Sequence, residues 1–221
     1  MRESLKRMMK FAMPGLCKRG FFLLLLVCTF PAGISSAKAA TILVFGDSIS
    51  AAYGLEVEQG WVRLLQQKLD KSFPGKHTVV NGSLSGETTS GGKARLPALL
   101  KKHKPDVVIL ELGGNDGLRG QPPALMAANL KKMVADSRAA GAKVLLFGMK
   151  IPPNYGRAYT QAFEKVFVTV SAEEKVQLLP FFLEGIGGNA ALVQADGIHP
   201  VAKAQPILLQ NAWPLIEKAL K

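Results

Sequence analysis

The sequence predicts an α/β fold in which helices cover both faces of a five-stranded parallel sheet. Short apolar runs rich in Val, Ile, Leu and Phe alternate along the chain with longer amphipathic stretches. Such alternation is typical of βαβ units, whose strands run parallel and whose helices pack on the two faces of the sheet. We therefore expect a three-layer α/β/α sandwich.

Each element is predicted from its local pattern. Five short apolar runs with many β-branched residues indicate strands at 41–45, 77–81, 106–112, 143–148 and 176–181. Apolar residues at helical spacing indicate helices at 61–69, 96–102, 122–140, 157–171 and 202–220. Pro180 suits an edge strand, so the last strand is expected at an edge. The glycine- and serine-rich run 82–92 is expected to be a flexible loop.

The first 39 residues have the pattern of a secretory signal peptide. Basic residues precede an apolar block at 21–30, and a small-x-small cleavage sequence follows at 37–39. The block is shorter than the roughly 20 residues that span a bilayer, which argues against a membrane anchor. Bulky residues after Cys28 argue against a lipid-modified cysteine. We expect a secreted or periplasmic protein in which residues 40–221 form a single domain.

Composition excludes several classes of function for that domain. Cys17 and Cys28 both lie in the predicted signal, so the mature chain has no disulfide, cysteine nucleophile or Cys-based zinc site. The whole chain holds 28 Lys+Arg and 16 Asp+Glu. Seven of the basic residues and one of the acidic residues lie in the first 39 residues, so residues 40–221 carry a net charge of +6. No arginine stripe is interleaved with aromatics, so we expect no nucleic-acid binding.

A candidate site lies where the predicted strands end. Ligands of open α/β sheets bind beyond the carboxyl ends of the strands, and the first strand ends in Gly46-Asp47-Ser48. Asp47 and Ser48 also fit a simpler role as caps of a following turn or helix. Loops after the first three strands share one edge of a parallel sheet. Ser48, Gly86 and Asn115 are therefore expected to converge.

A serine nucleophile needs a base within roughly 2.6–3.2 Å and a third group that orients the base. Among the three histidines, His77 and His103 adjoin lysines and are expected at the surface. His199 follows Asp196 by three residues in a Gly-Pro turn, where the carboxylate can reach one ring nitrogen. An Asp-capped helix start with Pro200 in its first turn is a compatible alternative.

Gly86 and Asn115 can supply donors to an oxyanion. A glycine lets its backbone N–H approach a substrate, and an Asn amide after a strand can point into a cleft. The alternatives are an ordinary loop glycine and a turn-forming asparagine.

Four segments together resemble the signature blocks of the SGNH (GDSL-type) hydrolases: 46–50, 81–88, 112–120 and 196–200. The resemblance extends over essentially all of the predicted mature chain. It is greatest to the bacterial periplasmic group of multifunctional thioesterases, lysophospholipases and proteases and to related arylesterases. Ile49 replaces a leucine that is common in the family.

The resemblance implies a flavodoxin-like SGNH hydrolase fold and a serine esterase mechanism. It implies that Ser48 is the nucleophile, His199 the base and Asp196 the residue that orients the base. No metal or cofactor is implied. The expected substrates are small acyl esters and thioesters, including lysophospholipids, and a transient contact with a membrane surface is compatible with them. A monomer is the default expectation.

The resemblance also implies the surroundings of the reacting carbonyl. The oxyanion hole would consist of the backbone N–H groups of Ser48 and Gly86 and the side chain of Asn115. By analogy with similar enzymes, the loop 116–120 would lie over the acyl chain, with Leu118 in contact with it.

Three other interpretations are weighed against the esterase. The run 86–94 resembles a phosphate loop, but Glu87 stands where that motif needs glycine and Ala94 where it needs Ser or Thr. The G-x-S-x-G motif of α/β-hydrolases does not occur in the sequence. A catalytically inactive secreted binding module has no need for a base and its orienting carboxylate. Acylated carbohydrate stays open as an alternative substrate.

Overall fold

A parallel five-stranded sheet forms the centre of the computed structural model, which describes residues 39–221. The predicted signal peptide, with both cysteines, lies outside the described residues apart from Ala39. The strand order is β2-β1-β3-β4-β5, and all four pairings are parallel. The predicted α/β fold with a five-stranded parallel sheet is therefore confirmed. The strands are β1 (Ala40–Gly46), β2 (His77–Asn81), β3 (Val107–Glu111), β4 (Lys143–Phe147) and β5 (Gln177–Leu179).

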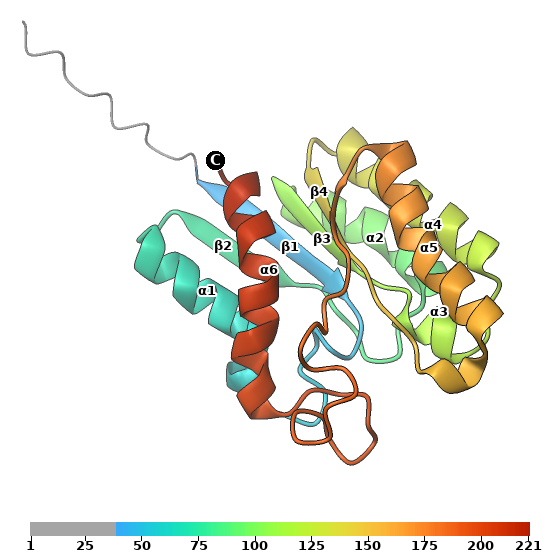
Figure 1. Ribbon diagram of the computed structural model, residues 1–221. Helices are drawn as coiled ribbons and strands as arrows, with labels where there is room; N and C mark the ends of the chain where they lie inside the picture. Colours follow the sequence, from blue (N-terminus) through green and yellow to red (C-terminus); the bar gives the residue numbers. More distant parts are fainter. Residues whose placement is uncertain (1–38) are drawn as a thin grey trace, which may run out of the picture. The chain divides into compact units, whose positions relative to one another are not determined.

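Helices cover both faces of this sheet. Figure 1 shows α1 and α6 on one face and α2, α4 and α5 on the other, and the packing of α1 on α6, α2 on α4 and α4 on α5 agrees with this. The helices are α1 (Trp61–Ser72), α2 (Thr89–His103), α3 (Gly114–Leu118), α4 (Pro123–Ala139), α5 (Arg157–Glu174) and α6 (Gln205–Ala219). Three short 3₁₀ turns join them: η1 (Val57–Gln59), η2 (Pro153–Tyr155) and η3 (Ala202–Ala204). Within residues 39–221, no helix has both the length and the apolar character needed to cross a membrane.

The core explains why the apolar runs become strands. All five residues of β3 are buried, and the ring of Trp61 packs against Phe147 and Phe182 with centroids 6.1 and 5.1 Å away. On the opposite face Phe163 and Phe167 meet edge to face. Full burial of one such side chain contributes about 1.5–3 kcal/mol to folding.

Part of the run expected to be a flexible loop is helical. Helix α2 begins at Thr89, because the side chain of Thr88 accepts a hydrogen bond from the N–H of Gly91 and caps the helix. The glycine at 92 allows close packing: a Cβ atom there would lie 2.5 Å from Leu112. The glycines that suggested flexibility thus let α2 approach the sheet. Pro97 lies inside the same helix.

His77 is buried, which contradicts its expected place at the surface. Only 4% of the residue is exposed, and its ring packs edge to face on Phe73 at a centroid distance of 5.2 Å. Burial lowers the pKa of the imidazole, and the nearby Lys76 lowers it further. His77 opens β2, far along the strand from the carboxyl ends where the candidate site lies.

Candidate active site

The turn that carries Ser48 follows directly from the end of β1. Gly46 is required there, because a Cβ atom at this position would lie 2.3 Å from the carboxylate of Glu111. Asp47 then accepts a hydrogen bond from the N–H of Ile49 at 3.1 Å, which holds the turn in place. Ser48 is 9% exposed. The turn-forming role considered for Asp47 is therefore observed, and it presents the next residue at the sheet edge.

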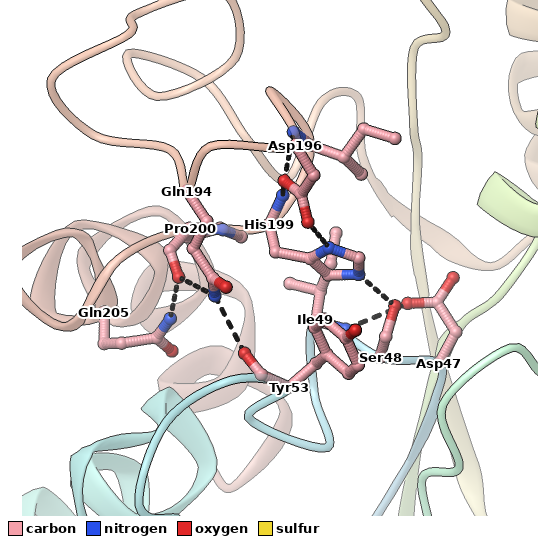
Figure 2. Close-up of polar contacts among 10 residues, drawn as sticks. Asp47, Ser48, Ile49, Tyr53, Gln194, Asp196, His199, Pro200 and Gln205 are labelled. Carbon is pink, nitrogen blue, oxygen red and sulfur yellow. Dashed lines mark hydrogen bonds and ion pairs between the residues drawn. The ribbon is translucent and has the colours of Figure 1, made fainter.

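His199 lies between Ser48 and Asp196. Its Nε2 is 2.8 Å from the Ser48 hydroxyl oxygen, and its Nδ1 is 2.6 Å from Oδ2 of Asp196 (Figure 2). The other oxygen of Asp196 accepts the backbone N–H groups of Ile198 and His199 at 2.9 and 3.0 Å. The local turn thus fixes the carboxylate, and the carboxylate fixes the imidazole. The loop that carries both residues follows β5 and reaches the end of the sheet where β1 terminates (Figure 1).

Hydrogen bonding keeps Asp196 ionised. Burial alone would raise its pKa, but the hydrogen bonds from the side chain and backbone of His199 and from the backbone of Ile198 outweigh it and lower the pKa to about 2. An ionised carboxylate only accepts hydrogen bonds, so Nδ1 of His199 must carry a proton. The Nε2 atom of the neutral ring is then free to accept the proton of the Ser48 hydroxyl.

Asn115 is brought beside the serine turn. It lies in the first turn of α3, directly after β3, and its Nδ2 donates to Oδ2 of Asp47 at 3.2 Å. The residue before α3, Gly113, has a φ of +122°, a conformation that strongly favours glycine. The short helix and this glycine place the amide against Asp47, in the turn that carries Ser48.

Gly86 lies in the loop that follows β2. The start of this loop runs along the serine turn, since the N–H of Leu84 donates to the carbonyl of Gly46 at 3.1 Å. Gly86 is exposed with a φ of +76°, and its carbonyl accepts a hydrogen bond from Arg119 at 3.1 Å. This contact joins the Gly86 loop to the segment after β3.

Leu118 ends α3 in that same segment. It is half-buried and packs against the hydrophobic core, while its carbonyl accepts the Tyr155 hydroxyl at 2.8 Å. Tyr159 donates to the carbonyl of Gln121 at 2.8 Å. Two tyrosines from η2 and α5 thus hold the end of α3, where Leu118 lies, and the residues that follow it.

Two carboxyl groups are buried at the serine turn: Asp47 lies in the turn and Glu111 lies beneath it. Glu111 accepts the Ser50 hydroxyl at 2.6 Å and the Asp47 N–H at 3.3 Å, and Trp61 donates to the Ser50 hydroxyl oxygen at 3.2 Å. Burial raises the pKa of Glu111 well above its ordinary value, and the charge of Asp47 adds to this. Burial also raises the pKa of Asp47 to about 6, against the opposing effect of the Ile49 N–H and of His199. These groups shape the turn from inside.

Sequence reasoning missed Glu111 and Asp116. A charged residue at the end of an otherwise apolar strand was the available signal for Glu111. Asp116 is buried and accepts the backbone N–H and the hydroxyl of Thr89 at 2.8 and 2.5 Å, and Asn129 donates to the same hydroxyl oxygen. It therefore fixes the start of α2 against α3. In residues 39–221, no group of three or more His, Cys, Asp or Glu side chains could hold a metal ion.

A sheet of this topology with an oriented imidazole beside a serine at its carboxyl edge defines a serine hydrolase of the SGNH type. Residues 44–205 match the GDSL-like lipase/acylhydrolase family. The chain belongs to this family and is a serine hydrolase, so the resemblance drawn from its four motif segments is confirmed.

Named relatives lie close to the chain in sequence and structure. It is 56% identical to the esterase TesA of Pseudomonas aeruginosa over 83% of this chain and 91% of the relative. The thioesterase 1/protease 1/lysophospholipase L1 of Escherichia coli is 44% identical over 85% and 86% of the two chains, and the arylesterase of Vibrio mimicus 43% over 83% and 92%. A crystal structure of TesA matches with a TM-score of 0.79 over 81% of this chain and 99% of that one. A structure of the esterase EstA from Pseudoalteromonas, inhibited by monoethylphosphonate, matches with a TM-score of 0.78 at 44% identity over 82% and 98%.

Proposed function

We propose that this chain is a secreted or periplasmic esterase that hydrolyses acyl esters and thioesters through Ser48, His199 and Asp196. The observation that carries the proposal is the continuous hydrogen-bond chain from the serine hydroxyl through the imidazole to the carboxylate, at 2.8 and 2.6 Å. The first distance lies in the range that proton transfer to a general base requires, and the second is that of the hydrogen bond that orients the base.

The proposed reaction has two halves. In the first, the Ser48 oxygen attacks the acyl carbonyl carbon while its proton passes to Nε2 of His199, and the ionised Asp196 stabilises the resulting imidazolium. The tetrahedral intermediate then expels the alcohol or thiol, which takes the proton from Nε2. In the second half, water attacks the acyl-serine with the same proton relay, and the carboxylic acid leaves.

The oxyanion of each intermediate would be bound by three donors: the N–H groups of Ser48 and Gly86 and the amide of Asn115. Support comes from the Asn115 side chain, whose Nδ2 already lies 3.2 Å from Asp47 beside the serine, and from the lack of a side chain at Gly86. The acyl chain would lie against Leu118.

The substrate class follows from the relatives. Their printed names include esterase, arylesterase, thioesterase and lysophospholipase, which act on an acyl group with an oxygen or sulfur leaving atom, and the Escherichia coli relative is also named a protease. The basic and apolar pattern of residues 1–39 supports export of the domain 40–221, which argues against a cytoplasmic acyl-thioester pool. We therefore propose a monomeric enzyme that needs no cofactor and releases fatty acids from lipid esters outside the inner membrane, with only transient contact to the membrane surface.

The test is hydrolysis of p-nitrophenyl esters and acyl thioesters of graded chain length by residues 40–221. Ser48→Ala should lower kcat by about 10⁴-fold or more, whereas Ser72→Ala, an exposed serine at the end of α1, should leave it unchanged. Equal turnover by the wild-type and Ser48→Ala proteins would refute the esterase proposal. Acylated carbohydrates are included in the panel, and preferential hydrolysis of these would assign the alternative substrate class.

A further inference from the structure

Tyr53 links the two loops that form the candidate active site. Its backbone N–H donates to the carbonyl of Ser48 at 3.0 Å, and its own carbonyl accepts a hydrogen bond from the Gln194 side chain at 2.8 Å. Its ring packs on the imidazole of His199, with centroids 4.4 Å apart and planes inclined by 38°. Figure 2 shows Tyr53 below the imidazole with Gln194 beside it.

Gln194, which binds the carbonyl of Tyr53, lies in the loop that carries His199. The backbone N–H of Gln194 donates to the carbonyl of His199 at 2.7 Å, and its Nε2 lies 3.4 Å from the carbonyl of Pro200. The Gln194 side chain, from the loop that carries His199, therefore binds the backbone of Tyr53. The Tyr53 ring, from the loop that carries Ser48, in turn packs on His199.

The backbone around Tyr53 is bent in an uncommon way. Ala52 has a φ of +58° and Gly54 a φ of +72°. The left-handed conformation is unfavourable for alanine, and such residues persist where their surroundings hold them. Ala52 is held against Gly60, where an added Cβ would lie 2.8 Å from that of Ala52. At Gly54 an added Cβ would lie 2.5 Å from Gln194, so the close approach of the two loops needs glycine.

The ring contact restrains a motion that the in-plane hydrogen bonds leave open. Ser48 and Asp196 bind the two nitrogens in the plane of the imidazole, but a ring held at two points can still tilt about the line between them. A ring packed on its face opposes that tilt. Its π electrons also favour the imidazolium that forms when the base takes the serine proton. Half of Tyr53 is exposed, whereas only 17% of the His199 side chain is.

We propose that Tyr53 is a positioning residue that holds His199 in line with Ser48, with Gln194 fixing Tyr53 in turn. The proposal rests on the proposed function, since it assigns Tyr53 a part in the proton transfer of that reaction. The ring does this work, and the phenol hydroxyl does not.

The experiment compares Tyr53→Phe, which keeps the ring, with Tyr53→Leu, which removes it. Tyr53→Phe should keep kcat within about twofold of the wild type. Tyr53→Leu should lower kcat about tenfold with less than a threefold change in KM, because the base is misaligned while the acyl contacts remain. Val57→Ala, an exposed apolar residue in η1, serves as the control and should change neither constant.

A second readout does not depend on turnover. The Nδ1 proton of His199, shared with Asp196 at 2.6 Å, should give a resolved low-field proton resonance in the wild type and in Tyr53→Phe. In Tyr53→Leu, exchange with solvent should broaden it. Gln194→Ala provides a second variant should Tyr53→Leu fail to fold, and it should give a smaller change in the same direction.

Wild-type kcat and an unchanged resonance in Tyr53→Leu would overturn the positioning role. Failure of the esterase proposal has a different signature: the wild type would lack turnover on every ester while the resonance still reported on Tyr53.

Discussion

Two carboxyl groups on opposite sides of the candidate site have pKa values shifted in opposite directions. Asp196 lies on the open side, with its side chain 37% exposed, and receives three N–H groups that lower its pKa to about 2. Glu111 lies on the closed side, fully buried beneath the serine turn, with its pKa raised by burial and by Asp47. The same functional group thus has its pKa lowered by hydrogen-bond donors beside the base and raised by burial beneath the serine turn.

The two carboxyl groups differ in what shifts their pKa, and this difference separates a predicted role in the reaction from one in the stability of the fold. Hydrogen-bond donors lower the pKa of Asp196, whereas desolvation raises the pKa of Glu111. Loss of Asp196 should therefore affect the rate, whereas loss of the Glu111 carboxyl should affect stability and its dependence on pH.

Asp196→Asn should give the largest effect on this comparison. The asparagine amide can donate to Nδ1 and hold the imidazole in the wrong tautomer, so kcat should fall by about 10³–10⁴-fold. The exposed position predicts a small change in the free energy of unfolding. Kinetics and urea denaturation measure the two, with Glu184→Gln from the same exposed loop as control. A variant that keeps a tenth of the wild-type rate would contradict the proposed role of Asp196.

Asn115→Ala should have the next largest effect. Removal of one oxyanion donor typically lowers kcat by about 10²–10³-fold, and KM should change much less because the donor acts on the intermediate. Asn154→Ala, an exposed asparagine in η2, is the control. A rise in KM by about 10²–10³-fold without a change in kcat would instead indicate that Asn115 binds the substrate in its ground state.

Glu111→Gln should change the pH dependence of stability. In the wild type the folded state keeps the Glu111 proton above the ordinary pKa of 4.5, where the unfolded chain has lost it. The free energy of unfolding therefore falls as the pH rises from about 4.5 towards the raised pKa. Glutamine has no such proton.

Urea denaturation at several pH values from 4 to about 8 measures this effect. The Glu111→Gln profile should be flatter than that of the wild type, whereas Glu58→Gln, which is exposed, should leave the profile unchanged. A Glu111→Gln profile as steep as the wild-type one would show that Glu111 does not hold its proton.

Ala52→Gly should have the smallest effect. Glycine relieves the left-handed strain at φ +58°, and the greater freedom of the unfolded chain offsets part of the gain, which leaves a stabilisation of up to about 1 kcal/mol. The neighbouring Ala51, which has no positive φ, provides the matched control: Ala51→Gly should destabilise by about 0.5–1 kcal/mol. Destabilisation by both changes would show that Ala52 is not strained.

The fold and the meeting of distant loops could be predicted because they depend on patterns that are local in the sequence. Apolar runs ending in glycine marked the strands, and parallel topology places their carboxyl ends at one edge. This edge brings Ser48 and His199 to 2.8 Å of each other across 151 residues. The family is confirmed by the comparisons, while the roles of the single residues stay predictions.

The remainder depends on contacts that no local pattern carries. His77 is buried because the ring of Phe73 packs on it, although a lysine precedes it in the sequence. The start of α2 is capped locally by Thr88, but Asp116 from α3 also accepts the backbone N–H and the hydroxyl of Thr89, and this contact comes from a distant segment. Tyr53 reads as an ordinary loop residue until the loop of His199 is folded over it.

Covalent labelling tests the central claim most directly. A fluorophosphonate should phosphonylate residues 40–221 once, with fluoride released, and peptide mass spectrometry should place the adduct on the peptide that carries Ser48. Labelling should be lost in Ser48→Ala and strongly slowed in His199→Ala, but unchanged in His103→Ala. An adduct on another residue, or one that persists in Ser48→Ala, would contradict the account.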